Sequence, residues 1–169
     1  MSVVSLVFQW LHLLAVITWI GGGIFNIFAL SPYLPAIELK QRAILLRRVF
    51  KRFLTLTWIS IAVIAASGLY RVFFVNQMVT AEPFLSTTYG NTLLVKLSLV
   101  STMIIIVATV TFVLFPKISG HLKGHETETV SPKMCPICGK MLKQVRQLMT
   151  AGLGLAVIVV LLAAFLRGA

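Results

Sequence analysis

An imidazole and an indole stand inside a long stretch of the chain that carries no charge. His12 and Trp19 both lie in residues 1–37, which contain no Asp, Glu, Lys or Arg. At about 3.6 residues per turn, positions 12, 16, 19, 23 and 26 fall on one stripe of a helix. Hydrocarbon cannot satisfy the ring nitrogens of His12 or the side-chain amide of Asn26. We therefore predict that this stripe faces other helices or a bound ligand.

Two cations and a phenol belong to other apolar segments. Lys96 interrupts one of them, and Tyr70 and Arg71 stand near the end of another. A charge in such a position is costly unless its side chain reaches the headgroups or has a partner. The apolar segments contain no Asp or Glu. The counter-charge is therefore predicted to be a lipid phosphate or a carboxylate of a bound ligand.

Haem b would meet these requirements. Its macrocycle needs an apolar slot, its iron accepts a neutral imidazole, and its propionates seek Lys or Arg. We predict His12 as an axial ligand and Lys96 and Arg71 near the propionates, with Trp19 and Tyr70 at the same site. The function would be electron transfer or haem-linked oxidation, although no set of residues dictates a reaction. The simpler alternative is that His12 only hydrogen-bonds across helices while both cations reach the headgroups.

A second group of candidate ligands lies between the last two apolar segments. Cys135 and Cys138 flank Pro-Ile and precede Gly-Lys, which is the form of a zinc knuckle that presents two thiolates to one metal. His121 and His125, four residues apart, could complete a tetrahedral set, and we place zinc ahead of copper or iron. Three alternatives stay open: knuckles of two chains sharing a metal, a redox dithiol, or two reduced cysteines.

The elements that must position these residues are membrane helices. The chain has 169 residues, of which 59% are hydrophobic, and this composition indicates an integral membrane protein rather than a soluble domain. Four segments are apolar enough to cross a bilayer, at about residues 3–30, 53–75, 92–115 and 147–166. Pro32 and Pro35 are expected to stop the first segment and Pro116 the third. The fold class predicted is an all-α four-helix membrane bundle in a single domain.

Twelve of the 15 Lys and Arg residues, which give the chain a net charge of +11, lie in two connections. Residues 37–52 and 117–146 each contain six Lys or Arg, whereas residues 76–91 contain none. The positive-inside rule then places both basic connections in the cytoplasm and both termini outside, in an inner membrane of bacterial type. Residues 37–52 are expected to extend the second span rather than to form a separate interfacial helix. Because topology explains the charge, nucleic acid is not a predicted partner; the partners expected are the lipid bilayer and either a second copy or a larger membrane complex.

Three short motifs resemble those of a known membrane family. They are His-Leu-Leu with Trp-Ile-Gly-Gly and a later proline (residues 12–32), Ser-Gly-Leu (67–69) and Leu-Val-Lys-Leu (94–97). Together they resemble the copper resistance D (CopD) type membrane domain over most of the chain. The resemblance implies copper transport across the cytoplasmic membrane as the rival function. Copper(I) prefers Cys, Met and His ligands, and the spans offer His12, Met103 and Met149.

The same landmarks resemble the HemJ-type protoporphyrinogen oxidases. That resemblance implies that His12 and Lys96 are the residues associated with b-type haem and activity. Leu94 stands where that family commonly has a second His, which weakens protoporphyrinogen oxidation specifically. A third class of function, a non-catalytic subunit that packs on a larger complex, predicts neither haem nor copper.

Overall fold

The computed structural model describes residues 3–70, 88–127 and 136–168, and all regular elements in these ranges are helices. Three elements are short, and two of them follow the first α-helix: the π-helical turn η1 (Phe25–Leu30), which continues it, and the 3₁₀ turn η2 (Leu34–Ala36). A second π-helical turn, η4 (Val110–Leu114), joins two α-helices without a break. The α-helices are α1 (Val3–Ile24), α2 (Leu39–Tyr70), α4 (Thr88–Thr109), α5 (Phe115–Thr127) and α6 (Pro136–Gly168).

Four of these helical segments are long and apolar enough to cross a membrane: Val3–Leu30, Lys40–Tyr70, Gly90–His121 and Gly139–Ala164. The predicted all-α four-helix membrane bundle is thereby confirmed. In their most apolar windows only 6% to 28% of the residues are buried by other parts of the protein. Such broad apolar faces require lipid or further helices around them.

The helices extend beyond the hydrocarbon thickness of a bilayer. Helix α2 has 32 residues, so at about 1.5 Å per residue it is roughly 48 Å long against a core of about 30 Å. Its first turns carry the basic residues of positions 40–52. These charges therefore sit on an unbroken extension of the second span, as expected, and not on a separate interfacial helix.

The prolines expected to end the first and third spans behave differently. The first span does stop at Pro32, where the chain turns into η2. Pro116, by contrast, lies inside a continuous helical run, because η4 immediately precedes it and α5 continues to Thr127. Proline removes a backbone donor and crowds the carbonyl four residues earlier. A wider π turn just before the proline accommodates both effects.

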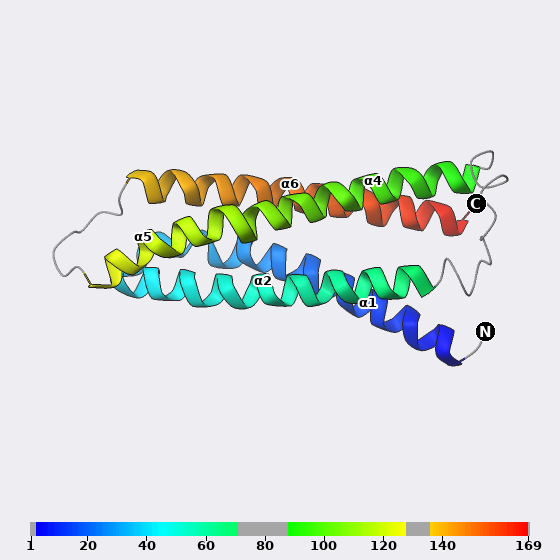
Figure 1. Ribbon diagram of the computed structural model, residues 1–169, viewed down its shortest axis with the longest axis horizontal. Helices are drawn as coiled ribbons and strands as arrows, with labels where there is room; N and C mark the ends of the chain where they lie inside the picture. The colour runs from blue at the N-terminus through cyan, green and yellow to red at the C-terminus, as the bar shows by residue number, and fades with distance from the viewer. Residues whose placement is uncertain (1–2, 71–87, 128–135, 169) are drawn as a thin grey trace.

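The helices form an elongated bundle in which α1 packs on α2, α4 packs on α6, and α5 packs on α2 (Figure 1). The first turns of α2, the first turns of α6 and helix α5 lie at one end of this bundle (Figure 1). The first turn of α1, the last turn of α2, the first turn of α4 and the last turn of α6 lie at the other end (Figure 1). We call these the basic end and the terminal end of the bundle.

The apolar core is concentrated toward the basic end. Its buried members come from η2, α2, η4, α5 and α6 and are Leu34, Ala43, Leu46, Leu54, Val110, Ile118 and Val145. Phe50 joins two helices there, because its ring stacks on Phe115 with centroids 6.3 Å apart. Toward the terminal end the groups buried between helices include hydroxyls, and this is where the candidate site begins.

Candidate functional site

The predicted stripe of α1 faces the interior of the bundle. His12, Val16, Trp19 and Gly23 are half-buried and Asn26 is buried, whereas residues between them such as Leu14 and Ile17 are exposed. Asn26 donates a hydrogen bond from its amide nitrogen to the carbonyl of Gly22 at 2.8 Å. The stripe therefore brings an imidazole, an indole and an amide to the inner face of α1 and η1 at intervals of about two turns.

His12 is held by a serine of the neighbouring helix. Its Nδ1 lies 2.7 Å from the hydroxyl of Ser67 on α2, a residue 55 positions away. Ser67 is only 1% exposed. Its hydroxyl also donates to the carbonyls of Val63, at 2.6 Å, and Ile64, at 3.1 Å. The hydrogen bond across helices that was the simpler alternative for His12 is thus present.

Tyr70 belongs to the same contact between α1 and α2. Its ring stacks on Phe8, with centroids 4.2 Å apart and planes 12° apart. Phe8 precedes His12 by four residues, and Tyr70 follows Ser67 by three, so the two pairs lie about one turn apart on both helices. The structure therefore brings two predicted site residues, His12 and Tyr70, to one region.

Lys96 is half-buried on α4, a helix that packs chiefly against α6. It precedes Met103 by seven residues, just as His12 precedes Trp19 by seven. Helices α1 and α4 both begin at the terminal end (Figure 1), and His12 and Lys96 follow their first residues by nine and eight positions. Arg71 lies outside the described residues.

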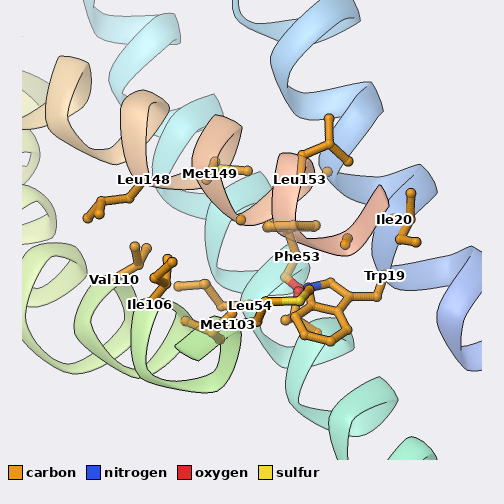
Figure 2. A pocket seen from close by; sticks show the side chains of 15 residues that line it. Trp19, Ile20, Phe53, Leu54, Met103, Ile106, Val110, Leu148, Met149 and Leu153 are labelled. Carbon is orange, nitrogen blue, oxygen red and sulfur yellow. The ribbon is translucent and has the colours of Figure 1, made fainter. Parts of the chain in front are cut away.

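A cavity opens between α1, α2, α4 and α6 on the side of His12 that faces the basic end. Figure 2 shows Trp19, Phe53, Met103 and Met149, one from each helix, turned into the same space. The cavity volume is about 60 Å³. Its lining residues are Trp19, Ile20, Gly23, Phe53, Leu54, Thr57, Met103, Ile106, Val107, Val110, Leu148, Met149, Gly152, Leu153 and Ala156.

Few side chains with heteroatoms line the cavity, and two of them are thioethers. The others are one indole and one hydroxyl, and none of the lining residues that the structure describes is charged. Met103 is 5% exposed and Thr57 is 2% exposed. The hydroxyl of Thr57 donates to the carbonyl of Phe53 at 2.9 Å. What faces the space is therefore mainly hydrocarbon and sulfur.

The haem prediction gains no support from this cavity. Its lining supplies no imidazole nitrogen for an axial bond and no cation for a propionate. His12 is not among the lining residues. The donor set that the structure places in the cavity does not fit haem b. Because His12 lies outside the cavity, haem ligation by His12 is not tested by it and stays a prediction.

Two features of the helix packing around the cavity were not assigned a role from the sequence. The first is the set of buried hydroxyls on α2, namely Thr57, Ser60 and Ser67. Their spacing of three and seven residues places them on one helical face, a signal that could have identified them. The second is Gly22, where an added Cβ would stand 2.9 Å from Cε2 of Phe53. The equivalent positions at Gly21 and Gly23 have nothing within 4 Å.

The predicted zinc knuckle falls largely outside what the structure describes. His121 lies exposed on α5. His125 and Cys138 are in helices, but their side chains are outside the described set, and Cys135 lies outside the described residues altogether. Among the side chains that are described, no three His, Cys, Asp or Glu residues converge. Zinc binding by these four residues stays a prediction.

Comparison with known proteins gives one match. A family model described as Copper resistance protein D matches residues 47–166, which is more than half of the chain. The matched region contains α2 from Arg47 onward, α4, α5 and most of α6, and it begins after α1. No curated protein and no solved structure matched the chain.

Proposed function

Because this chain belongs to the copper resistance protein D family, we propose that it binds copper(I) within the membrane and passes it across the bilayer. One observation carries the proposal. The thioethers of Met103 on α4 and Met149 on α6 line one cavity between four membrane helices. Soft sulfur ligands are those that copper(I) prefers.

The charge of the ion also suits the cavity. A monovalent cation loses less hydration energy on entering an apolar space than a divalent one, and polarizable sulfur compensates part of that loss. Trp19 adds an aromatic ring, whose face attracts cations. No hard oxygen ligand of the carboxylate type lines the described cavity. This donor set therefore favours copper(I) over magnesium or calcium.

His12 supplies the next ligand toward the terminal end. It precedes Trp19 by seven residues on α1, which corresponds to about 10 Å along the helix axis. Imidazole is a good ligand for copper. In this proposal the ion exchanges between His12 and the two thioethers, with the basic connections in the cytoplasm and the terminal end facing outward.

The decisive test is copper(I) affinity in purified protein. The protein is reconstituted in nanodiscs and titrated against a chromophoric copper(I) chelator under reducing conditions. Substituting Met103→Leu or Met149→Leu removes one sulfur at nearly constant volume, so packing is largely kept. We expect each change to weaken binding roughly 10-fold, which corresponds to about 1.4 kcal/mol.

Met141→Leu is the matched control. Met141 lies on the same helix as Met149 and packs against the apolar core near the basic end, but it does not line the cavity. Its substitution is expected to leave copper(I) affinity unchanged. If the Met103→Leu, Met149→Leu double variant binds copper(I) as well as the unsubstituted protein, the cavity is not the copper site.

The same preparation distinguishes the other classes of function. A Soret absorption band that disappears in His12→Ala would support haem ligation and contradict the copper proposal as stated. A colourless protein that binds copper(I) and carries it into liposomes supports the proposal. A protein that binds neither and is unstable unless other subunits are present would be a non-catalytic component of a larger complex.

A further inference from the structure

We propose that Ser67 is a positioning residue that fixes the tautomer of His12, so that the Nδ1 nitrogen carries the proton and the Nε2 nitrogen carries the lone pair. The pairing of these two residues joins α1 to α2 at 2.7 Å. Only the use of Nε2 as a copper ligand rests on the proposed function. The assignment of the tautomer rests on the hydrogen bonds alone.

The Ser67 hydroxyl carries a single proton. That proton is directed to the backbone carbonyls of the preceding turn, because Ser67 Oγ lies 2.6 Å from the Val63 oxygen and 3.1 Å from the Ile64 oxygen. A carbonyl oxygen can only accept, so the hydroxyl must be the donor in both contacts. The hydroxyl therefore offers lone pairs, and not its proton, to other partners.

His12 must then be the donor in its contact with Ser67. A neutral imidazole carries one N–H, and the two ring nitrogens are distinct. With the serine oxygen accepting at 2.7 Å from Nδ1, the ring proton resides on Nδ1. Nε2 is left with the lone pair that can coordinate a metal.

The burial of Ser67 strengthens the preference for a proton on Nδ1 of His12. The residue is 1% exposed, so water does not compete for its oxygen. In a low-dielectric interior, reversing the ring proton would place two lone pairs against each other, which is costly. Metal-binding histidines commonly have their second nitrogen fixed by such a partner, which sets both ring orientation and tautomer.

Ser60 provides a matched control on the same helix. It is 4% exposed and lies seven residues before Ser67, so it is equally buried about two turns away. Its substitution by alanine removes the same hydroxyl group without touching His12. Ser67→Thr is the conservative rescue, because Thr57 on this helix makes the same bond to the carbonyl four residues earlier.

The test is nitrogen NMR of full-length protein with ¹⁵N-labelled histidine, in nanodiscs and without copper. The His12 signals are assigned by their loss in His12→Gln. We expect Nδ1 of His12 to be protonated in the unsubstituted protein, in Ser60→Ala and in Ser67→Thr. In Ser67→Ala we expect the fraction of the ring protonated at Nδ1 to fall, because the oxygen that accepts this proton is removed. A proton on Nε2 in the unsubstituted protein, or no change in Ser67→Ala, would overturn the inference.

Copper(I) affinity provides the second measurement. Loss of a residue that orients a metal ligand typically weakens binding about 10-fold to 100-fold, and we expect Ser67→Ala to fall in this range and Ser60→Ala to show no effect. If the NMR result is as expected but neither Ser67→Ala nor His12→Gln alters copper(I) affinity, the tautomer assignment stands. In that case His12 is not a copper ligand, and this part of the proposed function fails.

Discussion

Gly22 is the position at which a single methyl group should disturb the contact between α1 and α2. An added Cβ would stand 2.9 Å from Cε2 and 3.3 Å from Cδ2 of Phe53. Both distances are shorter than ordinary carbon–carbon contacts of about 3.5–4.0 Å. The Phe53 ring would have to move into the cavity that it lines, or the two helices would have to separate.

The magnitude follows from two opposing contributions. Replacing glycine by alanine inside a helix stabilises it by about 1 kcal/mol, and this gain applies equally at positions 21, 22 and 23. Overpacking costs about 1–3 kcal/mol, and only Gly22 incurs it, because nothing lies within 4 Å of a Cβ at Gly21 or Gly23. We therefore expect Gly22→Ala to be less stable than either neighbouring variant by about 1–3 kcal/mol.

Thermal unfolding in detergent at a fixed scan rate is the assay. For a chain of this size 1 kcal/mol corresponds to about 2–4 °C, so the midpoint of Gly22→Ala should lie roughly 2–12 °C below those of Gly21→Ala and Gly23→Ala. Adding Phe53→Leu replaces the opposing ring by a shorter side chain. The double variant should therefore be more stable than the sum of the two single effects predicts, which is a favourable coupling between the two positions. Equal midpoints for the three alanine variants would refute the close contact between α1 and Phe53.

Two further predictions concern other parts of the chain. Trp58 donates from Nε1 to the hydroxyl of Thr111 at 3.2 Å, so Trp58→Phe and Thr111→Val should each lower the thermal midpoint by about 2–4 °C, for a bond of about 1 kcal/mol. Thr111→Ser, which keeps the hydroxyl, should retain the midpoint, and an equal loss in this variant would argue against the bond. If Cys138 is a zinc ligand, metal analysis of the purified protein should find about one zinc per knuckle site, lost in Cys138→Ser; unchanged metal content would exclude Cys138 as a ligand.

The sequence by itself determined the membrane character of the chain and the four segments that are apolar enough to span a bilayer. Long apolar segments between basic connections can be satisfied only as helices in lipid, because hydrocarbon offers no partner to the backbone. The inward stripe of α1 was predictable for a related reason. A ring nitrogen and an amide such as those of His12 and Asn26 are costly against hydrocarbon, so helical periodicity alone indicates which face turns inward.

The third span was expected to end at Pro116, but the helix continues through it. A proline weakens a helix at its own position, and that was the basis of the expectation. The structure continues the helix because η4 widens the preceding turn and α5 packs against α2. Packing of an entire helical face outweighs the local cost of one residue.

Only the tertiary structure decided which residues meet. Ser67 was visible in the sequence as part of a short motif, but its contact with His12 spans 55 positions. Likewise, three consecutive glycines look equivalent in the sequence, yet only Gly22 faces Phe53. The cavity with Met103 and Met149 depends in the same way on how four helices are rotated about their axes. That rotation is set by the summed packing of all the facing side chains. No local stretch of sequence contains this information, and the chemistry of the site depends on it.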